Sequence, residues 1–298
     1  MNIKSYRGTH TALVTPLLDD KVDWNCLEKL VDYQFNNGVD GLVSVGTTGE
    51  SPTLNTKEHL AVIEKTVEYA NSRGPVIAGT GANSTSEAVQ LTVEADKLGA
   101  NAFLIVAPYY NKPSQEGVYR HFAKIAESTE KPIVLYSIPG RCNIEVSVEV
   151  CKKLYRNYPH VAGIKEAGGS CDKVTALRNS LGEDYLILSG DDGLTIPFMG
   201  AGAEGVISVA SNAFPAQVSE LVQLGLKNDL QGAVHLHLKY NELFKTLFIE
   251  PNPVPIKYLM KKLGLLTSDE VRLPLCGLEQ SNQAVLEAVL ERSRDFLK

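Results

Sequence analysis

Eight short apolar runs recur along this chain of 298 residues, at intervals of about 30 residues, the size of one strand–helix unit. Each run is rich in valine, isoleucine and alanine and is bounded by glycine, proline or asparagine. Runs of this kind are typical of strands that are buried on both faces of a parallel sheet. The runs occupy residues 9–16, 41–49, 75–81, 102–108, 132–139, 161–167, 186–192 and 205–211.

The stretches between the runs carry apolar residues at helical spacing. One of them begins at Asp23 and ends at Gly38, and another begins at Ser86 and ends at Gly99, which are residue types that start and stop helices. Eight alternating strands and helices favour an α/β fold of the (β/α)8 TIM-barrel type over a doubly wound sheet. We therefore expect a catalytic barrel over residues 1–227.

Residues 228–298 have a different pattern, with three helical segments and prolines at positions 251, 253 and 255. Helices tend to break at proline, so the prolines mark a junction between two of these segments. We expect a C-terminal three-helix extension over residues 228–298. The sequence leaves two roles open for it, a cap on the bottom of the barrel or a contact with another subunit.

Composition and charge exclude several classes of partner. The formal net charge of -6 argues against nucleic acid or an anionic membrane. No run of about 20 apolar residues could span a bilayer, and the first ten residues lack the apolar core of a secretory signal. The five cysteines are scattered and form no C-x-x-C pair. We interpret them as reduced thiols and expect a cytoplasmic protein without a zinc site.

Two glycine-rich stretches imitate nucleotide-binding motifs. GAGAEG at residues 200–205 matches G-x-G-x-x-G, but a helical pattern precedes it and a strand follows, the reverse of a dinucleotide site. GTTGES at residues 46–51 lacks the G-K-[ST] ending of a phosphate loop. We interpret the first as a loop leading into the eighth strand and the second as a turn that ends the second strand.

The sixth run, in the stretch VAGIKEAGG, carries Lys165 at the strand end where a barrel of this type places its reactive groups. Lysine is rarely fully buried. Burial lowers the pKa of an amine because it disfavours the charged form, and a free amine can attack a carbonyl carbon and form a Schiff base. The alternatives are a lysine that reaches out of the barrel mouth or one that pairs with an acid such as Glu166.

Two further strand ends carry polar groups, each with two interpretations. Thr47 and Thr48 end the second run and could hold a carboxylate with hydroxyl and backbone N–H groups, or could only satisfy their own turn. Tyr136 and Arg141 belong to the end of the fifth run. A tyrosine can donate or accept a proton and an arginine can clamp a carboxylate, but they could equally be a core tyrosine and a surface arginine.

The ends of the fourth and seventh runs are less specific. Tyr109 and Tyr110 follow the fourth run and suggest an exposed aromatic loop, for function or for an interface. Asp191 and Asp192 follow the seventh run, and we interpret them as the cap of the next helix in preference to a pair of catalytic acids.

Six motifs, taken in order, resemble the dihydrodipicolinate synthase family. The resemblance extends over essentially the whole chain, and it implies a (β/α)8 barrel with a C-terminal helical extension, assembled as a homotetramer built from a dimer of dimers. The motifs are GTTGES at 46–51, PYYNKPSQEG at 108–117, YSIPGR at 136–141, GIKEA at 163–167, SGDD at 189–192 and GVISVAS at 205–211.

The resemblance implies a reaction, the condensation of pyruvate with L-aspartate 4-semialdehyde in diaminopimelate and lysine biosynthesis, without a metal or an organic cofactor. By that resemblance Lys165 would form the Schiff base with pyruvate. Tyr136 would shuttle protons, and Thr47 would link it to Tyr110, which would reach in from a neighbouring subunit.

The same resemblance implies how the substrates are held. Thr48 would bind the pyruvate carboxylate together with backbone N–H groups of its turn, and Arg141 would receive the carboxylate of the semialdehyde. Gly190 and Ile207 would supply backbone contacts around the Schiff base.

Three residues depart from the family pattern near the arginine. Cys142 and Asn143 follow it where the family usually has Thr-Gly, and Ser137 stands where the family usually has Asn. Their effect on the choice of second substrate is open at this point.

Relatives with the same pyruvate–lysine chemistry include N-acetylneuraminate lyase and other 2-keto acid aldolases. They generally lack an arginine placed like Arg141, and the neuraminate enzyme typically has Ser-Thr in place of Thr47-Thr48, so the synthase is favoured. A barrel that binds a keto acid without catalysis is a further alternative. It predicts damage to the pair Lys165 and Tyr136, and both residues are present.

Many bacterial and plant members of the family are inhibited by L-lysine at a subunit interface, and the resemblance predicts the same here. The matching positions are Ser51, His59, Asn83, Glu87 and Tyr109, with Glu87 pairing with the amino group of the ligand. The alternative is that residues 83–87 are only the polar start of a helix.

Overall fold

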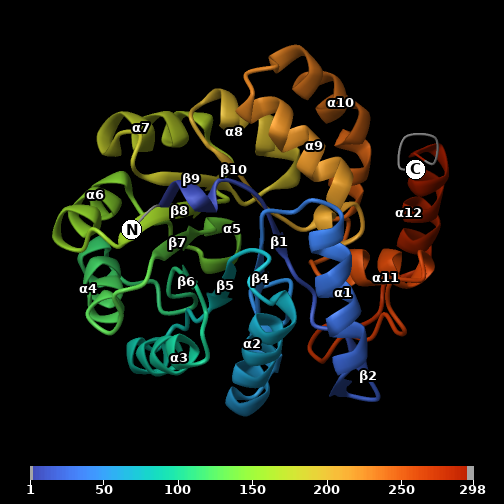
Figure 1. Ribbon diagram of the computed structural model, residues 1–298, viewed down its shortest axis with the longest axis horizontal. Helices are drawn as coiled ribbons and strands as arrows, with labels where there is room; N and C mark the ends of the chain where they lie inside the picture. The colour runs from blue at the N-terminus through green and yellow to red at the C-terminus, as the bar shows by residue number, and fades with distance from the viewer. Residues whose placement is uncertain (1–2, 294–298) are drawn as a thin grey trace.

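The computed structural model describes residues 3–293 and contains a closed barrel of eight parallel strands (Figure 1). Each of the eight apolar runs contributes one strand, so the predicted (β/α)8 TIM barrel is confirmed. Around the barrel the strands follow chain order, and β1 closes it by pairing with both β10 and β4. The barrel strands are β1 (Gly8–Ala12), β4 (Gly41–Ser44), β5 (Val76–Gly79), β6 (Ala102–Val106), β7 (Ile133–Ser137), β8 (Val161–Glu166), β9 (Leu186–Ser189) and β10 (Gly205–Ser208).

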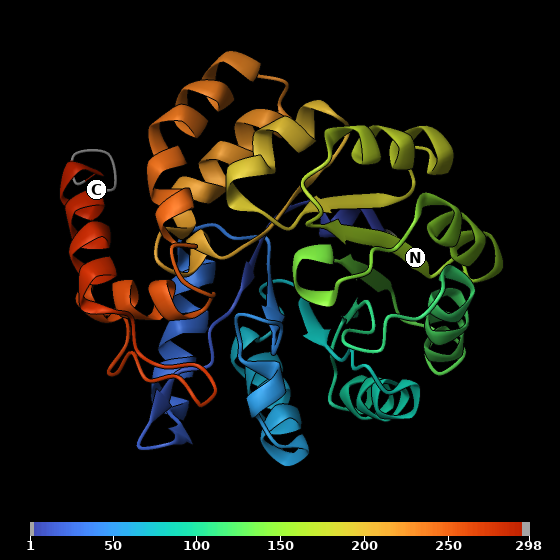
Figure 2. The ribbon, with the colours of Figure 1, turned by 180° about the vertical axis from the view of Figure 1, so that it is seen from behind.

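Helices form the outer layer of the barrel, as Figure 2 shows from behind. They are α1 (Trp24–Asn36), α2 (Thr56–Ala70), α3 (Thr85–Lys97), α4 (Gln115–Ala126), α6 (Val148–Asn157), α7 (Cys171–Leu181), α8 (Thr195–Gly200) and α9 (Pro215–Leu226). Shorter elements are α5 (Pro139–Cys142) and the 3-10 helices η1 (Ile3–Tyr6), η2 (Ser51–Thr53), η3 (Asp192–Leu194) and η4 (Ala210–Asn212).

Of the two helix starts that the sequence predicted, the one at Asp23 is right and the one at Ser86 is displaced. Asp23 caps α1, because its carboxylate accepts from the N–H of Cys26 at 3.0 Å. The start predicted at Ser86 is wrong by two residues, since Ser84 holds the extended cap position and Ser86 lies in the first turn of α3. Several polar residues in succession made either serine a plausible cap on pattern alone.

The alternation of side chains along the strands separates two cores. The inner core fills the barrel with residues such as Val43, Ile77, Leu104 and Leu188. The outer core lies between the strands and the surrounding helices and is much larger. A short hairpin, β2 (Leu17–Leu18) and β3 (Lys21–Val22), follows the first strand and was not predicted.

The glycine-rich stretch at residues 200–205 is a loop, as predicted. It follows the end of α8 at Gly200 and leads to the start of β10 at Gly205. Within residues 3–293, no helix is long and apolar enough to cross a membrane.

Over its described residues, 228–293, the C-terminal extension contains three helices, as predicted, α10 (Leu230–Thr246), α11 (Val254–Lys262) and α12 (Gln280–Ser293). In Figure 1, α10 lies outside α9, while α11 and α12 lie on the far side of α1. The segment around α11 contacts Thr48, Glu50 and Arg141, which follow the carboxyl ends of β4 and β7. A cap on the bottom of the barrel is therefore the wrong interpretation, because these contacts lie at the carboxyl ends of the strands, which form the top of the barrel.

Candidate active site

Lys165 lies inside the barrel near the carboxyl end of β8. Its neighbours in register are Tyr136 on β7 and Leu188 on β9, and both belong to the inner core. Because consecutive strand residues point to opposite faces, Glu166 points outward and pairs with Lys173 of α7 at 2.9 Å. Lys165 is 6% exposed. It therefore neither pairs with Glu166 nor reaches out of the mouth.

Burial lowers the pKa of Lys165 to about 7, because the interior disfavours its charged form. The negative charge of Asp192 works against this shift, and the positive charge of Arg141 adds to it. The Nζ atom lies 4.3 Å from the centre of the Tyr136 ring. A substantial fraction of the amine is therefore free at neutral pH, in direct contact with a tyrosine.

Gly190 gives the lysine side chain its space. A Cβ atom at this position would lie 3.0 Å from Cε of Lys165 and 2.7 Å from Cβ of Ala167. Ile207, on β10, is buried in the inner core that also contains Tyr136. Of the two positions expected around the Schiff base, Gly190 therefore lies against the Lys165 side chain and Ile207 lies in the inner core.

Tyr136 is buried in the barrel, and burial raises the pKa of its phenol to about 12. Arg141 and a hydrogen bond with the Thr47 side chain oppose this shift. Tyr136 therefore stays neutral near pH 7, as a group that passes protons without resting as an anion requires. The Thr47 side chain therefore lies within hydrogen-bonding reach of Tyr136, as a link between the two residues requires.

Thr47 belongs to the threonine turn, which we define as residues 46–51. The turn starts from a strained position, since Val45 has φ +54°, a region that β-branched residues rarely occupy. Gly79 accommodates the kink, because a Cβ there would lie 2.4 Å from the carbonyl oxygen of Val45. In the described part of the chain, the N–H groups of Thr47 and Thr48 donate to no protein acceptor. They are therefore available to a bound anion.

Asn252, which the sequence did not single out, holds two of the predicted residues. Its side-chain amide donates to the hydroxyl of Thr48 at 2.9 Å, and its carbonyl accepts from Arg141 at 3.2 Å. The hydroxyl groups of Thr47 and Thr48 therefore both have partners outside the threonine turn. The C-terminal extension reaches both groups that were expected to bind carboxylates.

A cavity of about 220 Å³ opens at this end of the barrel. Its lining includes Thr47, Tyr136 and Arg141, together with Tyr109 and Cys142. Lys165 is not part of this lining. The volume is below the roughly 300 Å³ at which sites for drug-sized ligands begin. The cavity therefore suits a molecule smaller than a typical drug.

Tyr110 lies outside this cavity. It is 89% exposed, has φ +71°, and lines a separate open hollow together with Arg141. Within residues 3–293, no hydrogen bond joins its hydroxyl to Tyr136 or Thr47. The chain thus brings together Lys165, Tyr136 and Thr47 but not Tyr110.

The five residues expected at an inhibitor site lie beside the cavity. Ser51 and Tyr109 line it, and His59 contacts the carbonyl of Gly79, another lining residue, at 2.8 Å. Asn83 and Glu87 both influence Tyr109, whose pKa is raised mainly by burial. Glu87 also lies in the first turn of α3, so the alternative of a polar helix start stands as well.

The two aspartates after β9 have different surroundings. Asp191 is a cap, as predicted, and accepts from the N–H of Gly193 at 2.8 Å at the start of η3. Asp192 is buried and accepts from the Ser208 hydroxyl and from the N–H groups of Val209 and Ala210. Its charge acts on Lys165, a role that the sequence did not reveal.

The three departures from the family pattern are not equivalent. Ser137 is buried and accepts from Val146 N at 3.2 Å and Lys173 Nζ at 3.1 Å, so it does not hold Arg141. Asn143 is exposed at the end of α5. Only Cys142 reaches the cavity wall.

Comparison with known proteins agrees with this geometry. The model of the dihydrodipicolinate synthetase family matches residues 5–293. A 4-hydroxy-tetrahydrodipicolinate synthase from Sulfurihydrogenibium sp. is 48% identical over 287 residues, which cover 96% of this chain and 98% of that protein.

Solved structures give the same result. The 4-hydroxy-tetrahydrodipicolinate synthase from the thermoacidophilic methanotroph Methylacidiphilum fumariolicum SolV superposes with a TM-score of 0.95 at 48% identity, covering 97% of this chain and 96% of that one. The DHDPS from Cyanidioschyzon merolae, with lysine bound, has a TM-score of 0.94 at 35% identity, with coverage of 97% and 99%. This chain therefore belongs to the dihydrodipicolinate synthetase family.

Proposed function

We propose that this chain is a lyase that condenses pyruvate with L-aspartate 4-semialdehyde to give 4-hydroxy-tetrahydrodipicolinate, in diaminopimelate and lysine biosynthesis. The observation that carries the proposal is the buried Lys165 amine, with a pKa lowered to about 7, against the ring of Tyr136. A lysine of this kind is suited to covalent catalysis on a carbonyl.

In the first step the Lys165 amine attacks the C2 carbonyl of pyruvate. The carbinolamine that results loses its hydroxyl group as water and becomes an iminium ion. Each of these transfers moves one proton, and the neutral Tyr136 can donate it and take it back. The pyruvate carboxylate is bound by Thr48 and the free N–H groups of the threonine turn.

The iminium makes the C3 methyl group acidic, because the electron pair left on C3 can flow to nitrogen. Loss of that proton gives an enamine, whose C3 attacks the aldehyde carbon of the semialdehyde and forms the new carbon–carbon bond. The amino group of the second substrate then attacks C2, closes the ring and releases the Lys165 amine. Arg141 binds the carboxylate of the semialdehyde at the cavity wall.

Protons leave and enter through a chain of hydroxyl groups. Tyr136 and Thr47 form its inner part, which is supported by their hydrogen bond. We propose that Tyr110 of a second copy completes the chain, since Tyr110 is 89% exposed and, within residues 3–293, makes no hydrogen bond to Tyr136 or Thr47 of its own subunit. This requires an oligomer, and we propose a homotetramer built as a dimer of dimers.

We also propose that L-lysine inhibits the enzyme by binding near Ser51, His59, Asn83, Glu87 and Tyr109. The DHDPS from Cyanidioschyzon merolae, with lysine bound, supports this. Titrating L-lysine into the assay tests it, and the expected result is a loss of activity that Glu87→Gln weakens. Flat activity up to millimolar lysine would reject the inhibitor site.

The state of the cysteine side chains supports a proposal for where the protein is located. All five cysteines are free thiols, three of them buried. This supports a reducing compartment, and we propose the cytoplasm.

The experiment that tests the reaction compares acceptors. Purified protein is given pyruvate with L-aspartate 4-semialdehyde, N-acetylmannosamine or glyceraldehyde, and pyruvate consumption is measured for each. We expect kcat/KM to be at least a hundredfold higher for the semialdehyde, since Arg141 favours an acceptor with a carboxylate. A preference for N-acetylmannosamine would assign a sugar-acid lyase, and consumption with none of the three would reject catalysis.

A further inference from the structure

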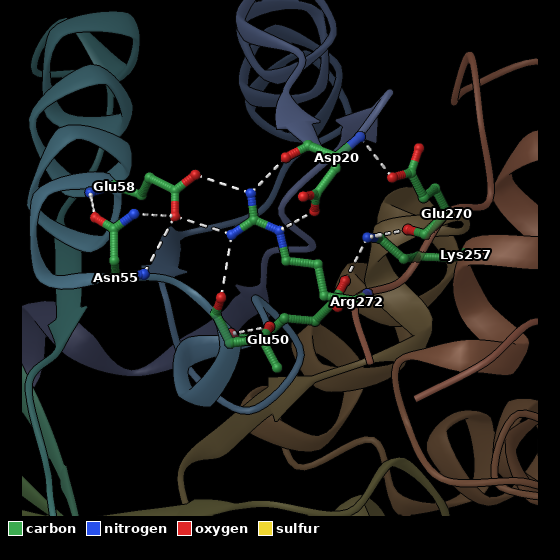
Figure 3. A network of polar contacts seen from close by, with 8 residues as sticks. Asp20, Glu50, Asn55, Glu58, Lys257, Glu270 and Arg272 are labelled. Carbon is green, nitrogen blue, oxygen red and sulfur yellow. Dashed lines mark hydrogen bonds and ion pairs between the residues drawn. The ribbon is translucent and has the colours of Figure 1, made fainter. Parts of the chain in front are cut away.

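A buried ion pair joins the threonine turn to the C-terminal extension (Figure 3). Glu50 lies in the turn and Lys257 in α11, and their side chains are 1% and 0% exposed. Lys257 Nζ donates to one carboxylate oxygen of Glu50 and to the carbonyl of Glu270 at 2.7 Å. The other oxygen of Glu50 accepts from the N–H of Arg272 at 3.0 Å. Both oxygens are therefore held by the extension.

Arg272 extends the same contact to the segment that follows the turn. In Figure 3 its guanidinium group lies between Glu58 and Asp20. It donates to both Glu58 oxygens at 2.8 and 2.9 Å and to the carbonyl of Thr53 at 3.1 Å. Glu58 in turn caps the start of α2 with Asn55. The extension thus clamps the threonine turn and the helix after it.

Hydrogen bonds within the turn connect the backbone of Glu50 to that of Thr47. The N–H of Glu50 donates to the carbonyl of Thr47 at 3.1 Å, and the N–H of Ser51 donates to the carbonyl of Gly46 at 3.3 Å. Glu50 itself has φ +57°, which a residue with a side chain keeps only where its surroundings hold it. Its carboxylate supplies that hold.

Stability alone is a weak reason for this pair. Removing two charges from water is costly, and apolar residues of similar volume often stabilise a core as well or better. A buried charged pair does, however, hold its two side chains in one arrangement, because either charge is costly to bury without its partner. The same extension also supports Thr48 and Arg141 through Asn252.

We propose that Glu50 and Lys257 are positioning residues for the condensation, and that their ion pair locks the threonine turn so that the Thr47 hydroxyl stays bonded to Tyr136. The C-terminal extension is thereby part of the catalytic apparatus of its own subunit. The inference rests on the proposed function, because it assigns the pair to the proton path of that reaction.

The test measures turnover per competent site in Glu50→Gln and in the double variant E50Q/K257M. Competent sites are counted as pyruvate trapped on Lys165 by borohydride. This count separates sites that no longer bind pyruvate from sites that bind it but turn over slowly. We expect turnover per trapped site to fall about tenfold in both variants, with KM for pyruvate changed less than threefold. The double variant leaves no unpaired buried charge, so it answers the question even where E50Q folds poorly.

Lys261→Met is the matched control. Lys261 also lies in α11 and forms an ion pair with Asp269 at 2.7 Å, but Lys261 is exposed, and in the described part of the chain neither residue makes a hydrogen bond to the threonine turn. Its turnover should stay within about twofold of the wild type, as expected for a surface pair.

A double-mutant cycle with Thr47→Val tests whether Glu50 acts through Thr47. We expect T47V to lower turnover about a hundredfold, and E50Q added to T47V to cost less than a further twofold, because the group it positions is already gone. If the effects of T47V and E50Q on turnover are fully additive, the inference is overturned while the proposed function stands. The same holds if turnover per trapped site is unchanged in E50Q and E50Q/K257M. A wild type that traps no pyruvate rejects the proposed function and the inference with it.

Discussion

Burial of Lys165 lowers the stability of the folded protein and makes the amine of this residue more reactive. Its environment is apolar enough to lower the pKa of the amine to about 7, although Asp192 opposes the shift. The sequence predicted the burial, because Lys165 follows Val161, Ala162 and Ile164 in a short run typical of a strand covered on both faces. It did not predict Asp192, which interacts with the amine only after β8, β9 and β10 are assembled.

The lowered pKa makes imine formation depend on pH. Attack on pyruvate needs the unprotonated amine, so the rate of imine formation should rise with pH up to about 7 and level off above about 8, with a value at pH 6 roughly a tenth of the plateau. Rapid borohydride trapping of pyruvate between pH 5.5 and 10 measures this. A rate that still rises tenfold between pH 8 and pH 10 would show an ordinary lysine pKa.

The same shift predicts that removing the lysine stabilises the fold. The lowered pKa means that the folded chain holds the protonated amine at a cost. This cost is full below about pH 7 and falls progressively as the pH rises toward 10.5, where the unfolded chain also loses the proton. We expect Lys165→Met to be inactive but more stable at pH 7, by on the order of 2 kcal/mol.

Thermal midpoints of Lys165→Met, wild type and the control Lys261→Met, recorded at one heating rate at pH 7 and pH 9.5, check this. The amount by which the midpoint of Lys165→Met exceeds that of the wild type should be smaller at pH 9.5 than at pH 7. A midpoint below that of the wild type at both values would contradict the sign of the shift.

At the scale of elements, strand β8 presents a reactive amine on its inner face and a structural ion pair on its outer face. Lys165 points into the barrel, and Glu166 points to the helix layer, where Lys173 of α7 meets it. The run GIKEA predicted the strand, but the sequence left a pair between Lys165 and Glu166 open as an alternative. The period of two along a strand rules that pair out, because it places adjacent residues on opposite faces. Which helix residue pairs with Glu166 could not be predicted, since it depends on how α7 packs.

We expect Lys173→Met to destabilise the protein without removing a catalytic group. It leaves the fully buried Glu166 carboxylate without its cation, which should cost on the order of 2 kcal/mol, or roughly 3 °C in the thermal midpoint for a chain of this size. Lys124→Met, which breaks the exposed pair with Glu127, is the control and should change the midpoint by less than about 1 °C. Equal midpoints for both variants would show that the buried pair contributes nothing.

At the scale of the whole molecule, the sequence predicted the architecture but not how its two parts meet. We propose the boundary between them at residues 227–228, since α9 ends at Leu226 and α10 begins at Leu230. Across it, Glu50 and Lys257 are 207 residues apart, and no local spacing could have paired them. The role of Asn252 was hidden for the same reason, whereas the aspartates at the tip of the β2–β3 hairpin are a local turn signal.

The proposed role of Tyr110 predicts that sites are shared between subunits. Lys165→Ala and Tyr110→Phe should each be nearly inactive alone. In an oligomer that contains both, a site with its own Lys165 and the Tyr110 of the other subunit is complete, so co-expressed and co-purified mixtures should regain activity. Mixtures that stay as inactive as the parents would place Tyr110 outside the proton path or within its own subunit.

The central claim is that the Lys165 amine joins covalently to pyruvate. Borohydride reduction with and without pyruvate, followed by peptide mapping by mass spectrometry, tests it most directly. We predict one pyruvate-dependent adduct per chain, on the peptide that contains Lys165, which is absent in Lys165→Ala. An adduct on another lysine, or none in an active preparation, would contradict the account.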